Sequence, residues 1–515
     1  MVDSGFYGVV IFYNFINMEQ VMVEGGVKDK VSSHARDYDD FLWSKQGHLL
    51  DLSYMELEEK NLELKKERLS GVTSEQMKER MLEYLREEKG VKAVTVCFTD
   101  LEGRLHALDY DKKHILGSED NLTFDGSSIK GFSRQCESDL RLSLDWTSFR
   151  WLPADLFGPG KVLLFGNVCD RDGGDYGSDF RSRLASFSME LAAKGLTVNV
   201  APEVEGFLFK GLKAEQEFDE KKGFELATMS GYFSSLPQDT LRVFIDKFAE
   251  VQRALGFQNE KDHPEVAPAQ FELNFRYSVA LDTADQIQLY KLLARQVATM
   301  MGLTASFLPK PVQELNGNGM HTNISLSKDG VNIFYDGAGE NNLSADAWDF
   351  CSSVLTHAKD LCLVMNSSVN SYRRLDPAYE APNEIKVSSV DRGSMVRIPI
   401  GNEKSARIEV RTIAPDVNPY LTFFAILKAG MKGMDEKMKL AGKVEKLPGT
   451  IDKALKHFKK SEFMKEVMGE AAHEKYYSLK SAQADRSPRA LGSKIKSGEV
   501  LYHHEITNQL LWADF

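Results

Sequence analysis

Two glutamates within an otherwise apolar, strand-like segment constrain the fold of this chain more than any other feature. The segment Pro202-Glu-Val-Glu-Gly-Phe-Leu-Phe209 separates Glu203 from Glu205 by one residue, and residues two apart on a strand share a face. Like charges on one buried face are costly unless a cation lies between them. The segment therefore predicts a site for a divalent cation. The alternative, a solvent-facing pair on an edge strand, stays open.

A second acidic segment runs from Asp262 to Glu272 and contains Glu265. Pro264 and Pro268 exclude a regular helix, so we expect irregular chain that leads into a strand. Its spacing alone does not distinguish ligands from surface carboxylates. A lone histidine such as the one before Pro264 is expected to be structural.

A third segment places a histidine where an apolar strand begins. Asn316-Gly317 and Asn318-Gly319 precede His321, and both pairs permit positive φ and close approach of the backbone to a ligand. His321 is therefore a candidate ligand at the rim of a pocket. Taken alone, it is more often structural.

One face of a predicted strand carries only charged side chains. Arg407, Glu409 and Arg411 alternate with Ile408 and Val410, so the other face is aliphatic. A carboxylate between two guanidinium groups can bind a cation while the guanidinium groups bind anions. An exposed face with internal ion pairs is the alternative.

Arginines gather around a predicted loop over residues 370–382 and the segment behind it, residues 391–399. Locally clustered arginine in an acidic protein indicates a specific anionic ligand, such as the phosphates of a nucleotide. The charged residues of this region are Arg373, Arg374, Glu380, Arg392 and Arg397.

The chain divides by composition into an N-terminal extension over residues 1–72, a small domain over 73–175 and a large domain over 176–515. The extension holds a helix over residues 50–71, rich in Glu, Lys and Leu, which we expect to be an exposed, solvated arm rather than a binding element. Thr73 and Gln76 fit a capping box that begins the next helix. A hairpin over residues 91–108 and further strands make the small domain α+β.

Beyond the glycine-rich linker at residues 173–177, predicted helices alternate with short strands, which indicates one large α/β or α+β domain. The expected helices cover residues 181–194, 237–256, 283–302, 345–366, 418–432 and 450–470. The expected strands cover residues 198–209, 270–277, 320–326, 394–400 and 405–413.

Composition excludes several classes of function. The net charge of −12 over 515 residues argues against general binding to nucleic acid or to anionic membranes. The first apolar stretch, residues 6–16, is too short to span a bilayer and has no basic residues before it. The five scattered cysteines form no C-x-x-C pair. We therefore expect a soluble cytoplasmic protein with free thiols.

Six motifs in order resemble those of glutamine synthetases, over about residues 82–496. They are Phe-Asp-Gly-Ser-Ser-Ile at 124–129, Pro-Glu-x-Glu at 202–205, Glu-Val-Ala at 265–267, Asn-Gly-x-Gly-Met-His at 316–321, Asn-Ser-Tyr-x-Arg-Leu with Tyr-Glu-Ala-Pro at 370–382, and Arg-Ile-Glu-Val-Arg with Asn-Pro-Tyr at 407–420. Residues 447–455 also resemble the bacterial and archaeal type I branch. The resemblance implies an α+β fold: a β-grasp domain, and a large domain with a curved antiparallel sheet and helices.

The resemblance also assigns metal ligands. It implies that Glu205, Glu265 and Glu272 bind one divalent cation and that Glu203, His321 and Glu409 bind a second. Five carboxylates and one imidazole suit Mg²⁺ or Mn²⁺. It further implies glutamate, ammonium and ATP as substrates, and a homo-oligomer of stacked hexameric rings with sites between subunits.

Roles for the remaining residues follow from the same resemblance. Without it, Asp125 before Gly-Ser-Ser is only a turn residue. The resemblance implies that Asp125 enters the neighbouring subunit's site, binds ammonium and takes its proton, and that Glu380 closes over the intermediate. The implied phosphate-binding residues are Arg392, Arg397 and Arg407, and the implied glutamate-binding residues are Arg374, Arg411, Asn316 and Gly317.

Three features depart from the type I pattern. Asn323 stands where a second histidine is usual, and its amide can donate to a phosphate but carries no charge. His263-Pro264-Glu265 replaces His-His-Glu, and the interval from Glu265 to Glu272 is one residue shorter. The rival functions are a γ-glutamyl ligase for a larger amine, a non-catalytic structural homologue and a relative of phosphagen kinases.

Overall fold

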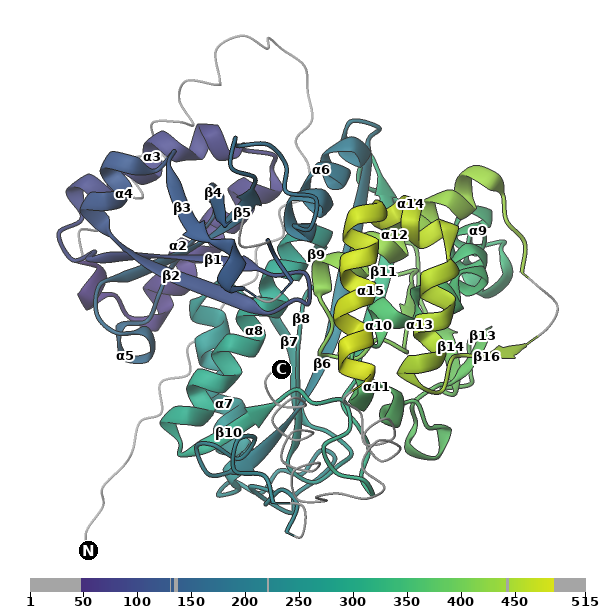
Figure 1. The fold of residues 1–515 in the computed structure, drawn as a ribbon. Coiled ribbons are helices and arrows are strands. Elements are labelled where there is room, and N and C mark those ends of the chain that lie inside the picture. Colours follow the sequence, from purple (N-terminus) through teal and green to yellow (C-terminus); the bar gives the residue numbers. More distant parts are fainter. Residues whose placement is uncertain (1–47, 130, 134–137, 220–221, 441–443, 486–515) are drawn as a thin grey trace, which may run out of the picture. The chain divides into compact units, whose positions relative to one another are not determined.

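The computed structural model describes residues 48–129, 131–133, 138–219, 222–440 and 444–485, and the expectations for residues 1–47 lie outside them. Two sheets organise this part of the chain (Figure 1). One has five strands in the order β2-β1-β5-β4-β3, and the other has eleven strands around β6. The predicted combination of a small α+β unit and a larger, mainly antiparallel one is therefore present.

The small sheet begins with the predicted hairpin, whose strands pair residue 93 with 111 through 99 with 105. β1 and β5 are parallel, whereas the other neighbours are antiparallel. Its strands are β1 (Ala93–Thr99), β2 (Leu105–Asp111), β3 (Leu122–Asp125), β4 (Asp139–Trp151) and β5 (Lys161–Cys169). Its short helices are α4 (Lys112–Ser118) and α5 (Ala154–Phe157).

Helix α3 (Ser74–Glu87) begins where its capping box predicts. The Thr73 side chain accepts from the Gln76 backbone N–H, and the Gln76 side chain returns a bond to the Thr73 N–H. The apolar side chains at positions 77, 81, 82 and 85 are buried, and the helix packs on β4. Local capping and burial of one face thus agree here.

β6 (Leu196–Lys210) is the central strand of the large sheet. It pairs antiparallel with β11 (Met320–Lys328) on one side and with β8 (Gln270–Phe275) on the other. Because β6 lies inside the sheet, the edge-strand alternative for Glu203 and Glu205 is wrong. The remaining strands are β7 (Asn259–Pro264), β9 (Ser278–Val279), β10 (Leu303–Ser306), β12 (Val331–Asn332), β13 (Glu384–Ser388), β14 (Ser394–Arg397), β15 (Ile408–Val410) and β16 (Glu445–Lys446).

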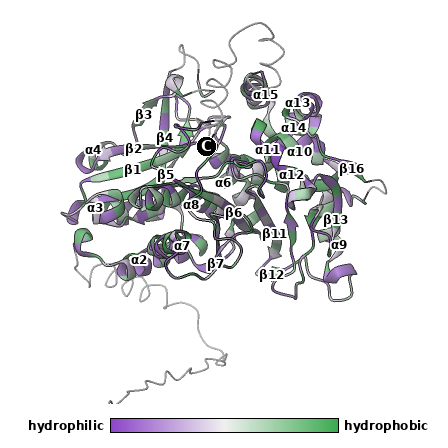
Figure 2. Ribbon diagram, turned by 90° about the horizontal axis from the view of Figure 1, so that it is seen from below, coloured by the Kyte–Doolittle hydropathy of each residue, from purple (hydrophilic) through white to green (hydrophobic). Residues whose placement is uncertain are grey.

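Helices cover the large sheet. α13, α14 and α15 lie together, and α10 and α12 contact members of this group (Figure 2). The helices are α6 (Phe180–Ala192), α7 (Thr240–Ala254), α8 (Ala280–Met300), α9 (Ala345–Thr356), α10 (Ala358–Met365), α11 (Val369–Arg374), α12 (Pro419–Glu436), α13 (Ile451–Lys460), α14 (Glu462–Met468) and α15 (Glu470–Ala484). Among the described helices, none is both long and apolar enough to cross a bilayer.

The structure corrects three expectations about local structure. The chain before Glu265 is not irregular but forms β7, which ends at Pro264, where the ring needs no ladder donor. Within the predicted loop over residues 370–382, α11 forms because Ser368 and Ser371 make a capping box. The long helix expected over residues 345–366 is divided at His357, between α9 and α10.

The prediction of an exposed, solvated helical arm is also wrong. The helix itself is present as α2 (Tyr54–Leu69). Leu57, Asn61 and Leu64 are almost wholly buried, and α2 contacts both α7 and β4. Its polar residues mislead a composition-based reading because several of them are buried with partners from distant segments. The domain limits at residues 72 and 175 stay predictions.

Helix α12 packs closely on α9 at Gly430, so we expect substitution of this glycine by alanine to lower the stability of the fold. A Cβ at Gly430 would lie 2.0 Å from Cε2 of Phe350. Helix propensity favours Ala over Gly by about 1 kcal/mol, but overpacking costs about 1–3 kcal/mol or more. We expect Gly430→Ala to lower the thermal unfolding midpoint.

Gly117 in α4 is the matched control, since nothing lies within 4 Å of a Cβ built there. Gly117→Ala should leave the midpoint unchanged or raise it. An unchanged or raised midpoint for Gly430→Ala would contradict the packing of α12 on α9.

Candidate active site

Three strands place one group of candidate ligands. His321 on β11 is opposite Glu203 on β6, and Glu409 on β15 is opposite Asn323, two residues further along β11. Because residues two apart share a face, Glu203, His321 and Glu409 converge, with ligand atoms all within 4.8 Å of one another. We call them the first cluster.

A second group arises from the same register on the other side of β6. Glu272 on β8 is opposite both Glu205 on β6 and His263 on β7. His263, Glu265 and Glu272 offer ligand atoms within 4.8 Å of one another, and we call them the second cluster. The Oε1 atom of Glu205 lies 4.0 Å from Nδ1 of His321, so Glu205 joins the two clusters.

All six predicted ligands therefore line one region, and His263 is an addition that the sequence reading missed. Its Nδ1 lies 3.0 Å from the Pro264 carbonyl oxygen. Its Nε2 is buried, lies 3.6 Å from Oε1 of Glu272 and has no hydrogen-bond partner among the described residues. The available sequence signal was the position of His263 within the acidic segment, two residues before Glu265.

Crowded charge perturbs these carboxyl groups. Burial and then the charge of Glu205 raise the pKa of Glu265 to about 7. Burial and then the charges of Glu205, Glu203 and Glu265 raise the pKa of Glu272 well above its usual range. Burial also opposes ionisation of Glu203, but hydrogen bonding to His321 and Asn323 lowers its pKa to about 2. Like charges in a low-dielectric site produce the upward shifts, which a cation would reverse.

Two guanidinium groups hold Glu409. Arg397 Nη1 donates to its Oε2 and Arg411 Nη1 donates to its Oε1, each at 2.5 Å. The Glu409 side chain is only 1% exposed. The ion pairs expected in the alternative interpretation of this strand face are present. The face is not exposed at Glu409, however, so that part of the alternative is wrong.

Arg374 on α11 is a buried cation with spare donor capacity. Its Nη2 donates to the Arg411 carbonyl at 3.0 Å and lies 3.4 Å from His321 Nε2. Its Nη1 is buried, and no side chain or backbone group in the described part of the chain accepts from it. Burial lowers its pKa to about 10. A Cβ on Gly319 would lie 2.5 Å from the Arg374 Nη2, so this glycine permits close approach to the guanidinium.

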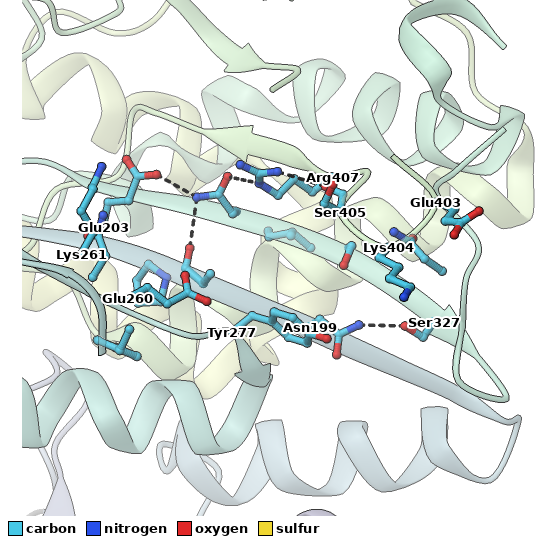
Figure 3. A pocket seen from close by; sticks show the side chains of 18 of the residues that line it. Asn199, Glu203, Glu260, Lys261, Tyr277, Ser327, Glu403, Lys404, Ser405 and Arg407 are labelled. Atoms are coloured by element: carbon cyan, nitrogen blue, oxygen red, sulfur yellow. Dashed lines mark hydrogen bonds between the residues drawn. The ribbon is translucent and has the colours of Figure 1, made fainter. Parts of the chain in front are cut away.

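A cavity of about 950 Å³ lies alongside the first cluster and is lined by Glu203, Asn323 and Arg407 (Figure 3). The Asn323 Nδ2 donates to Glu203 Oε1 at 3.1 Å, and its Oδ1 accepts from Arg407 Nε at 2.9 Å. Asn323 therefore fixes Arg407 relative to a carboxylate of the first cluster.

The other lining residues of this cavity were not expected from the sequence. Tyr277 is half exposed there, and a flat aromatic ring in a cavity suits stacking with a nucleobase. Lys261 and Lys404 add positive charge. Nothing in the sequence pattern marked these positions, because they come from three separate segments.

A third set of side chains lies around the second cluster. Asn316 Nδ2 donates to Glu380 Oε2 at 3.1 Å, and Glu380 has the left-handed φ of 63°. Burial raises the pKa of Tyr232. The charges of Glu265 and Glu380 raise this pKa further, whereas the charge of Arg392 lowers it. Tyr232 thus marks a common neighbourhood for these groups, again without a sequence signal.

Asp125 lies in the small sheet, at the end of β3. It accepts from the Ser127 N–H at 2.9 Å and the Ser127 hydroxyl at 2.6 Å, and from the Ser128 hydroxyl. These hydroxyl bonds lower the pKa of Asp125. Its side chain is exposed. Its hydrogen bonds lie within its own turn, and its predicted entry into a neighbouring subunit's site stays a prediction.

Two family models match the chain. "Glutamine synthetase, beta-Grasp domain" matches residues 90–171, and "Glutamine synthetase, catalytic domain" matches residues 178–493. These matches confirm the expected fold class, with a β-grasp domain and a large domain of curved sheet and helices.

Curated relatives and solved structures agree with the family models. A glutamine synthetase of Methanosarcina mazei is 36% identical and covers 79% of this chain and 94% of the relative. One of Staphylococcus aureus is 36% identical over 78% and 93%. A structure described as "GmaS/ADP complex-Conformation 1" is 27% identical with a TM-score of 0.70, covering 83% and 98%. A Plasmodium falciparum glutamine synthetase, 22% identical with a TM-score of 0.71 over 83% and 98%, supports the fold alone.

The raised pKa of Glu265 predicts a pH-dependent response to divalent cations. Its pKa rises from 4.5 to about 7, so the folded chain keeps a proton that the unfolded chain loses. Stability without metal therefore falls as pH rises from about 4.5 to 7. Because a cation requires the ionised carboxylate, Mn²⁺ should raise the thermal unfolding midpoint more at pH 8 than at pH 6.

The control variants separate this group from its neighbours. Glu265→Gln should reduce the pH dependence of the Mn²⁺ shift, whereas Glu260→Gln, an exposed residue lining the cavity, should preserve it. If Mn²⁺ raised the thermal unfolding midpoint at pH 6 as much as at pH 8, or more, the result would contradict the interpretation of Glu265 as a metal ligand.

Proposed function

Because the chain belongs to the glutamine synthetase family, an enzyme family that uses ATP and divalent metal ions, we propose that it joins ammonia to the γ-carboxylate of L-glutamate. ATP phosphorylates this carboxylate to give γ-glutamyl phosphate and ADP. Ammonia then attacks the acyl carbon, phosphate leaves, and glutamine is released. One observation carries the proposal: two clusters of candidate ligands are joined through Glu205, and the first cluster reaches the cavity through Glu203, where Arg407 also lies.

The donor set of the two clusters fits two divalent cations, Mg²⁺ or Mn²⁺, since carboxylate oxygens dominate it. Bound there, the cations would neutralise the ATP phosphates and hold the glutamate carboxylate. We assign Glu203, His321 and Glu409 to one cation, and Glu205, Glu265 and Glu272 to the other. His263 is a further candidate for the second.

Positively charged side chains bind the anionic parts of the substrates. Arg407, held by Asn323 at the cavity, contacts the phosphates, and Arg397 and Arg392 act near the transferred group. These arginines stabilise the negative charge that develops on the phosphoryl group during its transfer. Arg374 offers its unpartnered Nη1 to glutamate, together with Arg411, Asn316 and Gly317.

Proton transfer requires carboxylates near the acyl carbon. Ammonium must be bound by anions and lose a proton before it can attack. We assign binding and deprotonation to Asp125, contributed by a neighbouring subunit in a ring-shaped homo-oligomer. Glu380, poised beside Asn316, closes over the intermediate and excludes water.

A γ-glutamyl ligase for a larger amine is the second candidate. Tyr232 and Phe233 are stacked with ring centroids 3.8 Å apart and are 50% and 56% exposed. The Phe233 ring packs edge-on against His263 of the second cluster. Apolar surface at this place would suit the hydrocarbon part of an alkylamine.

Omission of single substrates separates these functions. We expect ADP formation that requires glutamate and ammonium together, in the presence of Mg²⁺ or Mn²⁺. A requirement for methylamine, ethanolamine or a polyamine in place of ammonium would instead support the second candidate. ADP formation without any amine acceptor, or with a guanidino substrate, would contradict both.

Replacing a carboxylate of the first cluster tests catalysis directly. Glu409→Ala removes a ligand and takes the carboxylate partner from Arg397 and Arg411, so turnover should fall by about a hundredfold or more. Glu403→Ala, at the end of the cavity away from Glu203 (Figure 3), should retain activity. Turnover in Glu409→Ala equal to that of the wild type would contradict the assignment of Glu409 as a ligand, and a wild-type chain without turnover would support the non-catalytic homologue.

The role of Asn323 is separable from that of the metal ligands. Asn323→Ala releases Arg407 and also removes a hydrogen bond to Glu203. Loss of the charge-assisted bond to Arg407 alone costs about 1.5 kcal/mol, which corresponds to roughly tenfold. We expect the KM for ATP to rise by about tenfold, with the KM for glutamate little changed. Ser327→Ala, which removes a bond to Asn199 in the same cavity, should leave both constants near those of the wild type.

A further inference from the structure

Helix α2 (Tyr54–Leu69) lies outside both matched segments, residues 90–171 and 178–493, yet it is built into the fold. It begins with a capping box between Ser53 and Glu56. Its inner face is almost wholly buried, with Leu57 at 1%, Asn61 at 0% and Leu64 at 2% exposure. A helix that only extended into solvent would not bury an amide on this face.

Asn61 bonds to backbone groups of both domains. Its Nδ2 donates to the Trp151 carbonyl at 3.0 Å and to the Ala254 carbonyl at 2.7 Å, and its Oδ1 accepts from the Trp151 N–H at 3.0 Å. Trp151 ends β4 of the small sheet, and Ala254 ends α7 of the large domain. One amide thus satisfies three backbone groups that lie 90 or more residues away.

A glycine permits this close approach. Gly256 has a φ of 80°, and a Cβ there would lie 3.1 Å from the Cβ and the backbone of Asn61. The chain after α7 therefore turns tightly beneath α2. Both partners of the contact are specified by their residue type.

Arg68 makes a second link of the same kind. Its Nη1 donates to Asp282 at 3.1 Å and its Nη2 to Asp285 at 2.7 Å, both on α8 of the large domain. The same Nη2 lies 3.6 Å from Asp145 on β4. Arg181 also donates to Asp145 and Asp285, so Arg68 completes a buried network across the two domains.

Strand pairing continues from these contacts to Asp125. β4 pairs antiparallel with β3, with Asp139 opposite Asp125. The strand that α2 grips at Trp151 and approaches at Asp145 is therefore the strand on which the Asp125 turn rests.

We propose that α2 is a positioning element that fixes the small sheet on the large domain and thereby the place from which Asp125 acts. This inference rests on the proposed function, in which Asp125 binds ammonium. The cavity assigned to ATP is lined by residues between Asn199 and Arg407, all in the large domain. Loosening α2 should therefore impair the use of ammonium and spare the binding of ATP.

Steady-state kinetics of the full chain tests the split. Asn61→Ala leaves the backbone groups of Trp151 unpaired, and Arg68→Met removes the charge while keeping much of the stem. We expect either change to raise the KM for ammonium at least fivefold and to leave the KM for ATP within twofold. Arg68→Lys should give a smaller rise, because it keeps the charge without the fork geometry.

Lys66→Ala is the matched control on the same helix. Lys66 is 75% exposed and pairs with Glu63, so all Michaelis constants should stay within twofold of the wild type. Amide hydrogen exchange in Asn61→Ala adds a structural readout: protection of the Trp151 amide should be lost while that of Asn323 and neighbouring β11 amides is kept.

The contrary results are distinct. A lower unfolding midpoint in Asn61→Ala, Arg68→Met and Arg68→Lys, with every KM unchanged, would show that α2 only stabilises the fold and would overturn the inference. An equal rise in the KM for ATP and ammonium would overturn it as well. A wild-type chain without ammonium-dependent ADP formation would contradict the proposed function itself and, with it, the action of Asp125.

Discussion

Repulsion among five carboxylates that share one partly buried region is the constraint on which the rest of the site depends. Negative charges on Glu203, Glu205, Glu265, Glu272 and Glu409 repel one another, and burying such charges is costly without compensating positive charge. The guanidinium groups of Arg397 and Arg411 supply it for Glu409, and His321 and Asn323 supply bonds to Glu203. Among the described residues, neither Glu265 nor Glu272 has an arginine partner of this kind, and their pKa values are raised. The imbalance points to cations as the missing charge.

Strand register around β6 produces this arrangement. β11 and β8 flank β6, so one row of cross-strand neighbours brings His321 to Glu203 and another brings Glu272 to Glu205. A shift of one residue in either pairing would turn these side chains to the opposite face. The apolar residues that alternate with them bury the other face, so packing of the core and placement of the ligands depend on the same register.

The parts predictable from sequence are those governed by local periodicity. The common face of Glu203 and Glu205, the grouping of Arg411 with Glu409 at β15 and the capping box at Thr73 follow from spacing alone, and each is present. The long motif series also made the family recognisable. Positions that depend on distant partners were not predictable: Tyr232, Tyr277 and His263 carry no pattern of their own. The prediction that α2 is a solvated arm was wrong for the same reason. Asn61 and Arg68 are polar residues whose burial depends on partners in β4, α7 and α8.

Anomalous diffraction from crystals of the full chain grown with Mn²⁺ and ADP would test the central claim most directly. The account predicts two manganese peaks on each chain, one among Glu203, His321 and Glu409 and the other among Glu205, Glu265 and Glu272. Manganese bound only elsewhere, with both carboxylate clusters empty beside the nucleotide, would contradict it.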